Sequence, residues 1–182
     1  NMFQNANGLS TRGKCALHNA FKSNSNWDYN WTSGCGGWQP QNKTELQTAV
    51  DLWASDNKSN ALWNYGDINT WDVSLITDMS SLFKDKATFN DNISTWDVGK
   101  VTSMYMMFQG ASVFNQDISS WKVDNVTNMV RVFVHSREFN QDISSWNVSK
   151  VTDMNHMFYG ARKFNQDIGS WNVDNVTNMQ WM

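Results

Sequence analysis

The chain has 182 residues, a net charge of −3 and a charged fraction of 17%, which is below the quarter usual for soluble domains. Such a neutral surface lacks the basic stripe that nucleic-acid binding requires. No apolar run approaches the roughly 18 residues of a membrane-spanning helix, so the sequence predicts no membrane span in this segment.

Residues 1–35 differ from the rest of the chain. Met2-Phe3-Gln4-Asn5-Ala6 matches Met107-Phe108-Gln109-Gly110-Ala111, so the chain begins inside a repeat. The pattern then changes to a polar, turn-rich stretch. We interpret 1–35 as the end and the C-terminal cap of a preceding repeat array, because the last unit of an array needs an atypical covering unit.

Cys15 and Cys35 are the only cysteines. Two well-separated cysteines in a polar, loop-rich segment are typical of a disulfide and therefore of an oxidising compartment. The alternative is a pair of free thiols. A bridge here would stabilise the fold by roughly 3 kcal/mol in the chain-entropy account.

Residues 36–65 are expected to form a linker and a helical N-terminal cap. Gly34-Cys35-Gly36-Gly37, followed by Pro40, marks the linker. Thr44 and Gln47 have the spacing of a capping box, with Thr44 as the N-cap. Helical spacing then continues to about residue 55 through Leu46, Ala49, Val50 and Trp53.

Five repeats of 25 residues, the last incomplete, occupy 66–182. Their tryptophans recur at this spacing, at Trp71, Trp96, Trp121, Trp146 and Trp171. A fixed period between 20 and 50 residues marks a stacked array. The chain ends at nearly the repeat phase at which it begins, which favours a longer array; an ordered fragment is the alternative.

The spacing within one unit predicts its secondary structure. Ile143, Trp146, Val148 and Val151 are spaced as in leucine-rich repeats, where a short strand sends alternate residues into the core. We predict a strand at 145–148 and a helix at 152–161. The predicted fold class is therefore an α/β solenoid, leucine-rich-repeat-like, with one short parallel strand and one short helix per coil and atypical capping segments.

Two columns of side chains are expected to join the coils. The tryptophans share the inward strand face with valines, so a buried core ladder is favoured over a sugar-binding aromatic face. The asparagines that end each complete repeat should satisfy turn backbone groups from coil to coil; they are Asn90, Asn115, Asn140 and Asn165.

The outward strand positions form a candidate binding face of small polar residues. It could hold a protein partner, a glycan or another copy of the same protein, and a solvated face is the alternative. The face comprises Thr70, Asp72, Thr95, Asp97, Ser120, Lys122, Ser145, Asn147 and Asn172.

The sequence offers no catalytic constellation, metal site or cofactor motif, so we expect a protein that is not an enzyme. His18, His135 and His156 lack metal-ligand spacing. A recurring acidic column could bind calcium, yet it could equally cap turns, which is the interpretation we favour. This column is Asp67, Asp117, Asp142 and Asp167, interrupted by Asn92.

The third repeat departs most from the pattern. Val132-Phe133-Val134-His135-Ser136 replaces the Met-Phe-x-Gly-Ala of the cleaner copies. We expect an altered helix end here, with Arg131, His135 and Arg137 facing a partner.

Asparagine sequons are frequent, and some would carry glycans in a eukaryotic secreted protein. Asn30, Asn42 and Asn57 lie outside the repeats and are the candidate glycosylation sites. The alternative is that an asparagine-rich chain produces sequons by chance.

The repeat phrase Phe-Asn-Gln-Asp-Ile-Ser-x-Trp-x-Val-x-x-Val-Thr-x-Met-x-x-Met-Phe resembles the repeat of BspA-like surface proteins. It is similar to a leucine-rich-repeat-like unit of mycoplasma surface proteins and bacterial lipoproteins, also found in algae. The resemblance covers 66–182 and, less closely, the flanking caps. It implies an extracellular or cell-surface solenoid used in adhesion, display or assembly, without enzyme activity.

We therefore expect a non-catalytic extracellular structural subunit of a fibre, appendage or surface layer. It would associate with neighbouring copies of the same module through solenoid ends or faces. The alternative is an adhesin, a module that binds a glycan or a surface protein on the polar face of its sheet.

Overall fold

The structure of the protein is a computed structural model that describes residues 37–182. The predicted cap at 1–35, the bridge between Cys15 and Cys35 and the sequon at Asn30 lie outside the described residues. Most of the described chain is irregular coil. Its helices are α2 (Lys43–Trp53), α3 (Lys58–Tyr65) and the 3₁₀ turn η2 (Ile68–Thr70), and no extended strand occurs between residues 37 and 182.

The helix predicted after Pro40 is confirmed as α2, but its capping box begins two residues earlier than expected. Asn42 is the N-cap, and its side-chain oxygen accepts the Glu45 N–H at 3.0 Å. The Glu45 carboxylate in turn accepts the Gln41 N–H at 2.9 Å. This arrangement places a carboxylate in the first turn, where the helix dipole favours negative charge.

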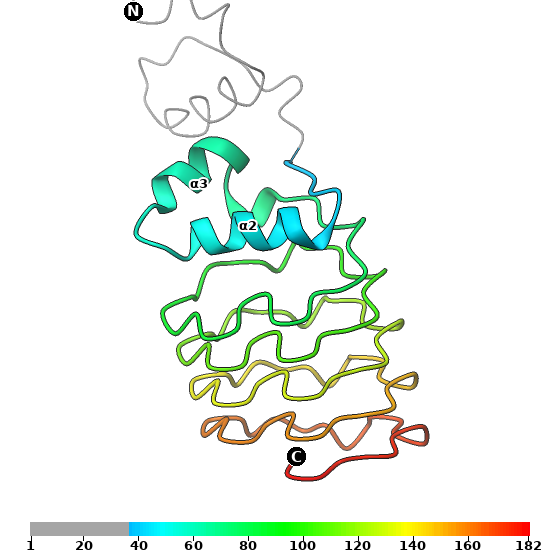
Figure 1. Ribbon diagram of the computed structural model, residues 1–182. Helices are drawn as coiled ribbons and strands as arrows, with labels where there is room; N and C mark the ends of the chain where they lie inside the picture. The colour runs from blue at the N-terminus through cyan, green and yellow to red at the C-terminus, as the bar shows by residue number, and fades with distance from the viewer. Residues whose placement is uncertain (1–36) are drawn as a thin grey trace, which may run out of the picture.

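Helix α2 lies across the first coil of the repeats (Figure 1). Its apolar face is buried there through Leu46, Ala49, Val50 and Trp53. Polar contacts fix its position: the Gln47 side-chain amide donates to the Leu82 carbonyl at 3.1 Å. Lys43 pairs with Asp78 at 2.8 Å.

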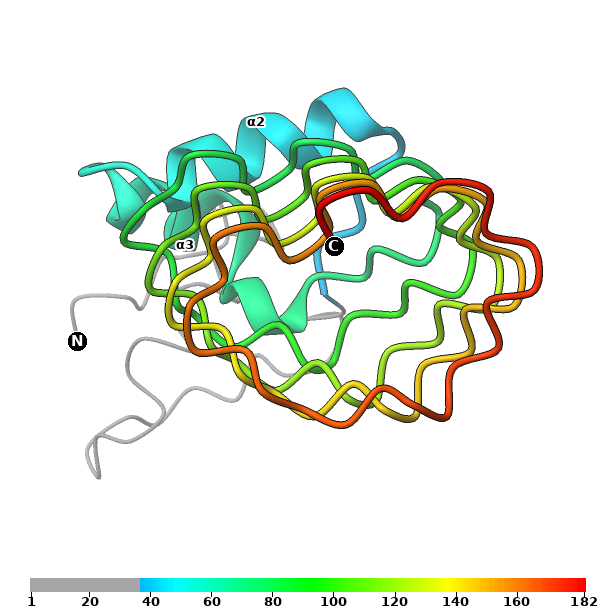
Figure 2. The ribbon, with the colours of Figure 1, turned by 90° about the horizontal axis from the view of Figure 1, so that it is seen from below.

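From residue 66 onward, successive 25-residue segments lie one upon another (Figure 1). Seen along the stack, their outlines nearly superimpose (Figure 2). Isolated parallel β-bridges join equivalent residues of neighbouring segments: Asp78 to Ser103, Ser103 to Asn128, Asn128 to Asp153 and Asp153 to Asn178. The 25-residue period of the sequence is therefore also the spacing between residues that are bridged in neighbouring segments.

The strand predicted at 145–148 is wrong, although the predicted alternation of burial is correct. Trp146 and Val148 are buried, whereas Ser145 and Asn147 are exposed. The backbone nevertheless turns here, because the Trp146 N–H donates to the carbonyl of Ile143, within its own segment, at 3.1 Å. Single bridges and turns thus replace the predicted parallel sheet.

The helix predicted at 152–161 is also wrong. We call 79–85, 104–110, 129–135 and 154–160 the ribbon segments. In the first ribbon segment, the backbone N–H groups of alternate residues donate to backbone carbonyls of the next coil at 2.7–3.0 Å. The pairs are Met79 with Ser103, Ser81 with Tyr105, Phe83 with Met107 and Asp85 with Gln109. The same four bonds recur in 104–110 and 129–135, and in 154–160 Met154 and His156 form the first two of them. These N–H groups all point toward the following coil.

Left-handed residues explain why the ribbon segments are not helices. In 104–110, Met106 and Gly110 have φ of 56° and 73°, and in 154–160 His156 and Gly160 have φ of 57° and 73°. A left-handed residue interrupts the hydrogen bonds of a right-handed helix, so the freed N–H groups bond to the adjacent segment. Met154 and Met157 remain buried as predicted, because their side chains also point into the core from the ribbon segment 154–160.

The asparagine column predicted between coils is confirmed. The Asn115 N–H donates to the Asn90 side-chain oxygen at 2.9 Å, and the Asn140 N–H donates to that of Asn115 at 2.9 Å. The Gln141 side-chain amide adds a second donor to the Asn115 side chain, also at 2.9 Å. One amide oxygen therefore holds both the backbone and a side chain of the next coil.

Replacing Asn115 with alanine should lower the free energy of unfolding by about 1–3 kcal/mol, because it leaves the Asn140 N–H without its acceptor. Urea denaturation followed by circular dichroism would measure the change. Asn115→Asp is the matched variant, since its carboxylate keeps both acceptor bonds and should retain most of the stability. Equal losses in the two variants would contradict this role for the amide oxygen.

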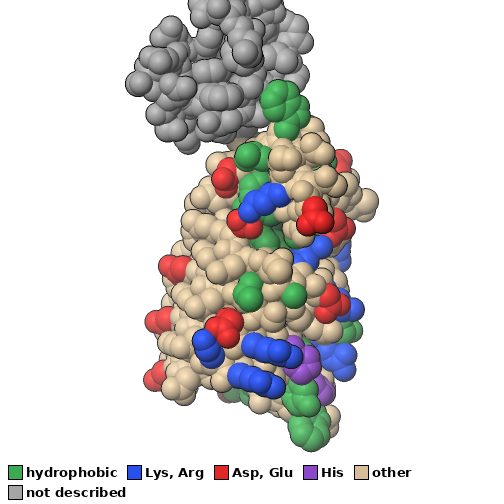
Figure 3. All heavy atoms as spheres, turned by 90° about the vertical axis from the view of Figure 1, so that its left-hand side faces the viewer, with side chains coloured by type: hydrophobic (Ala, Val, Ile, Leu, Met, Phe, Trp, Pro, Cys, Tyr) green, Lys and Arg blue, Asp and Glu red, His purple; other side chains and the backbone are tan. Residues whose placement is uncertain are grey.

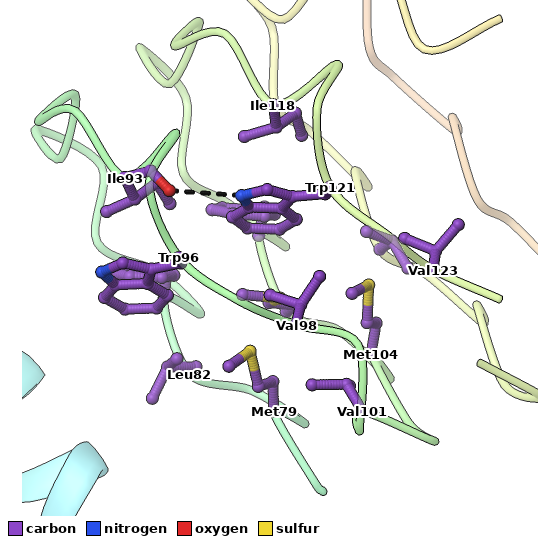
Figure 4. Close-up of a cluster of buried hydrophobic side chains, with 14 of the residues drawn as sticks. Met79, Leu82, Ile93, Trp96, Val98, Val101, Met104, Ile118, Trp121 and Val123 are labelled. Atoms are coloured by element: carbon purple, nitrogen blue, oxygen red, sulfur yellow. Dashed lines mark hydrogen bonds between the residues drawn. The ribbon is translucent and has the colours of Figure 1, made fainter. Parts of the chain in front are cut away.

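The core is a continuous cluster of aromatic and aliphatic side chains. Each repeat tryptophan is at least nine-tenths buried, as the predicted ladder requires. In addition, the indole N–H groups of Trp96, Trp121, Trp146 and Trp171 each donate to an isoleucine carbonyl of the preceding coil; that of Trp121 donates to Ile93 at 3.2 Å (Figure 4). This bond fixes the register of neighbouring coils, which apolar contact alone does not.

Phenylalanines form two further columns beside the tryptophans. In one, Phe83, Phe108, Phe133 and Phe158 are nearly parallel, with centroids 5.2–5.7 Å apart. In the other, Phe89, Phe114, Phe139 and Phe164 are 5.9–6.1 Å apart. Within each coil the two rings stack more closely, at 3.9–4.2 Å.

Candidate functional site

The predicted binding face is exposed at every one of its positions, from Thr70 to Asn172. Its hydroxyl groups, however, bond within the stack. Ser120 and Ser145 donate to the carbonyls of Ser94 and Ser119 in the preceding coil, at 3.2 and 3.0 Å. These hydroxyl groups therefore contribute to the joint between coils, and binding on this face stays a prediction.

The acidic and amide residues of the same face close turns. Asp72 accepts the Ser74 N–H at 3.1 Å, and Asn147 accepts the Ser149 N–H at 3.2 Å. The hydrogen bonds from the Ser74 side chain and backbone hold the pKa of Asp72 below its usual range. Lys122 interrupts this column of turn-closing residues.

The aspartate column considered for calcium closes turns as well. Asp117 accepts the Ser119 N–H and Asp142 the Ser144 N–H, both at 2.9 Å. Hydrogen bonds from the serine side chain and backbone lower the pKa of both carboxyls. Among residues 37–182, histidines and carboxylates form no group of three able to hold a metal ion.

One carboxylate lies under α2. Burial would raise the pKa of Asp78, but hydrogen bonds from Lys43 and Ser80 outweigh it and lower that pKa. Asp78 accepts the Ser80 N–H at 2.8 Å. It therefore closes a turn and anchors the helix with the same side chain.

Lowered carboxyl pKa values predict acid sensitivity. Because the folded pKa values of Asp72, Asp78, Asp117 and Asp142 lie below the unfolded value of about 3.9, protons bind the unfolded chain first. Their stabilisation is present above about pH 4 and is lost as pH falls through the folded pKa values. The urea midpoint should therefore decrease between about pH 5 and pH 3.

A combined Asp72→Asn, Asp117→Asn and Asp142→Asn variant is the control. Asparagine already fills these turn positions at Asn147 and Asn92, where it accepts the equivalent N–H. The variant should fold at neutral pH and lose less stability on acidification than the parent. An unchanged acid dependence would contradict the assignment to these carboxyls.

A hollow of about 330 Å³ lies on the ribbon segments of the second to fourth coils. We call it the ribbon hollow. Its lining consists of Gln109, Arg131, Val134, His135, His156 and Tyr159. Figure 3 shows the histidines of this side of the molecule next to lysine and arginine side chains and above exposed hydrophobic ones.

Aromatic rings define the wall of the ribbon hollow. Tyr159 is 46% exposed. His135 and His156 approach its ring edge-on, each with centroids 5.5 Å away. His156 also stacks against Trp181 at 6.2 Å and contacts the Asn155 side chain through its Nδ1.

One residue that lines the ribbon hollow, Gln109, has an unpaired polar atom. The side-chain oxygen of Gln109 is buried and has no hydrogen-bond partner. Leaving a buried acceptor unpaired costs about 1–3 kcal/mol, so a rotation of the Gln109 side chain toward a donor in the hollow would relieve that cost.

The third repeat, whose sequence differs most from the repeat pattern, predicted part of this site. Arg131 and His135, expected to face a partner, do line the ribbon hollow, whereas Arg137 is exposed outside the lining. The contributions of His156 and Tyr159 were missed, because local spacing does not show that a backbone N–H bonds to a carbonyl 24 residues later. The ribbon pairing of His135 with Tyr159, at 2.9 Å between backbone N and O, brings them together.

The described sequon asparagines outside the repeats are both exposed. Asn42 uses its side-chain oxygen to cap α2, and Asn57 precedes α3 without a capping bond. Their glycosylation stays a prediction. None of the helices between residues 37 and 182 has the length and apolar character needed to cross a bilayer.

Comparison with known protein families identifies a family that this chain matches over two ranges. The family model described as "Mycoplasma protein of unknown function, DUF285" matches residues 52–161 and again residues 124–182. No curated protein and no solved structure matches the chain. The two matches overlap and together span 52–182, most of the chain and all of its Trp71-to-Trp171 ladder. The chain therefore belongs to the DUF285 repeat family of mycoplasma proteins, in agreement with its repeat phrase.

Proposed function

We propose that this chain is a non-catalytic structural module of an extracellular fibre, appendage or surface layer. In this proposal its stacked segments form a solenoid that associates with further copies of the same module. One observation carries the proposal: in the ribbon segments, the N–H groups that leave a coil all bond to the following coil.

One-way bonding gives every ribbon segment two different edges. One edge of a ribbon segment offers N–H donors and the other offers carbonyl acceptors, as between Phe108 and Val132 at 2.9 Å. Helix α2 covers the first coil, where its Gln47 side-chain amide donates to the Leu82 carbonyl at 3.1 Å, so two copies would meet in the same orientation, with the donor edge of one stack against the α2 end of the next. A contact of this kind is head-to-tail, and repeated head-to-tail contacts extend into a filament when they do not close into a ring.

The use of the recurring polar side chains supports the same proposal. Threonines illustrate it: Thr102 and Thr127 each donate their backbone N–H and side-chain hydroxyl to the preceding threonine carbonyl, at 2.8–3.2 Å. Groups committed to the joints between coils stiffen the stack and are not free to perform chemistry. This suits a load-bearing module.

Sedimentation velocity over a range of concentrations, with electron microscopy of the same samples, tests the proposal. We expect linear assemblies that grow with concentration. Lys122→Glu reverses a charge on the exposed face of the coils and is the control that separates end contacts from face contacts. A chain that stays monomeric at every concentration would contradict assembly.

The extracellular part of the proposal has its own test. Non-reducing mass spectrometry should find a bridge between Cys15 and Cys35 in material from the native source. Free thiols at both positions would contradict an oxidising compartment, while leaving the assembly result to stand on its own.

A further inference from the structure

We propose that the ribbon hollow binds a carboxylated sugar, such as a uronate unit of an acidic polysaccharide. This inference goes beyond the proposed structural function and does not depend on self-association. It rests on three features of the hollow: a cation, an unpaired acceptor and an exposed aromatic ring.

The cation is Arg131. Its side chain is partly buried in the lining, and the lining contains no carboxylate that would neutralise it. A guanidinium presents paired donors that match the two oxygens of a carboxylate. An arginine at the wall of a hollow is therefore suited to one carboxylate group.

Further basic side chains lie close by in the same two coils. Arg137 and Arg162 are exposed at equivalent repeat positions, and the Lys163 backbone N–H bonds to the Arg137 carbonyl at 3.2 Å. Lys163 itself is paired with Glu138 at 2.5 Å. In a chain of net charge −3, this concentration of positive charge favours a polymeric anion over a single small one.

The unpaired acceptor distinguishes a sugar from a simple anion. The buried Gln109 oxygen needs a donor, which a carboxylate or a phosphate diester lacks. A sugar hydroxyl supplies one while the carboxylate of the same ring meets Arg131. The volume of about 330 Å³ is at the small end of ligand sites and suits one sugar ring.

The aromatic ring completes the recognition. Tyr159 is open to solvent and is held between two imidazoles, so it offers an apolar surface with a polar edge. Gly160 makes this arrangement possible, because a Cβ at that position would collide with the His135 ring.

The fold does not require these residues. The repeat position of Arg131 is occupied by Ser81 and Met106 in earlier coils, and that of Tyr159 by Lys84 and Val134. Those coils form the same ribbon bonds. The combination of arginine, tyrosine and paired histidines is thus a local addition to the repeat and calls for a role other than folding.

Isothermal titration calorimetry of the full chain with a tetra-galacturonate probe tests the inference. The fully methyl-esterified tetramer, with the same sugar rings and no charge, is the matched ligand control. We expect the free acid to bind and the ester to bind at least about tenfold more weakly, since a charge-assisted pair is lost. No binding of the free acid would overturn the inference.

Three variants locate the site. Arg131→Gln should weaken binding of the free acid about tenfold or more, and Tyr159→Ala should weaken both the acid and the ester. Lys122→Gln removes the same charge from another exposed position and should leave affinity within about twofold, since exposed charges at a distance are screened. Equal losses in Arg131→Gln and Lys122→Gln would show only general attraction and overturn the site.

Butane-1,2,3,4-tetracarboxylate, with the same charge but neither hydroxyl nor N–H groups, separates the ligand classes. We expect it to bind more weakly than the uronate, because it offers no hydrogen-bond donor to Gln109. Equal affinity for the two probes would overturn the assignment to a sugar. Circular dichroism confirms folding of each variant, and Tyr159 is exposed enough for its truncation to spare the core.

Discussion

Replacing Trp121 with alanine is expected to lower the free energy of unfolding by about 3–5 kcal/mol. The indole is only 3% exposed, so its removal leaves a cavity between coils. Because each coil contacts only its neighbours, this loss interrupts the stack in the middle. Urea denaturation followed by far-ultraviolet circular dichroism would measure it without depending on tryptophan fluorescence.

Trp121→Phe separates the stability contributed by the indole hydrogen bond from that contributed by the volume of the buried ring. Phenylalanine keeps much of the aromatic contact but lacks the N–H that reaches the Ile93 carbonyl. The Ile93 carbonyl also accepts the backbone N–H of Trp96 at 3.1 Å. Losing the bond from the Trp121 indole should therefore cost only about 1 kcal/mol. Trp63→Ala, at an indole 47% exposed, is the matched control. A cost at Trp63 as large as that at Trp121 would contradict the ladder's role.

Replacing Phe133 with alanine should cost about 3–5 kcal/mol. Its ring is completely buried and lies 3.9 Å from Phe139 within its coil. It also stacks between Phe108 and Phe158 of the adjacent coils, at 5.6 and 5.7 Å. Removing one ring therefore opens a gap in both directions along the column. Calorimetric unfolding would report the lost enthalpy together with the lower midpoint.

Tyr105→Ala provides the comparison for Phe133. Tyr105 is an aromatic residue on a ribbon segment of the neighbouring coil, but 36% of it is exposed. Its truncation should change stability by no more than about 0.5 kcal/mol. If Phe133→Ala were equally mild, the phenylalanine columns would be a by-product of the repeat and not part of what holds it together.

The aromatic columns and the polar columns have different effects on the fold. Burial of tryptophan and phenylalanine supplies most of the favourable free energy, but apolar contact alone permits neighbouring coils to slide. Directional bonds from the Trp121 indole, the Thr127 hydroxyl and the Asn115 amide fix the coils against one another. A stack held in one register can present the ribbon hollow at a fixed place.

The sequence determined the period, the inward residues and the turn-closing polar residues. A tryptophan that alternates with valine in every repeat is buried. An aspartate can close a turn by accepting the backbone N–H of the residue two positions later, as Asp117 does with Ser119. These outcomes depend on neighbours in the chain or on simple burial. They could therefore be predicted without knowing how the coils meet.

Only the tertiary structure decided the backbone of each unit and the composition of the site. The spacing of Met154, Met157 and Ala161 suits a helix, yet His156 and Gly160 are left-handed and the nearby N–H groups bond to the next coil. A choice between bonds within a segment and bonds to a segment 25 residues away cannot be read from local spacing. The same cross-coil pairing places His135 beside Tyr159, so the ribbon hollow exists only once the coils are stacked.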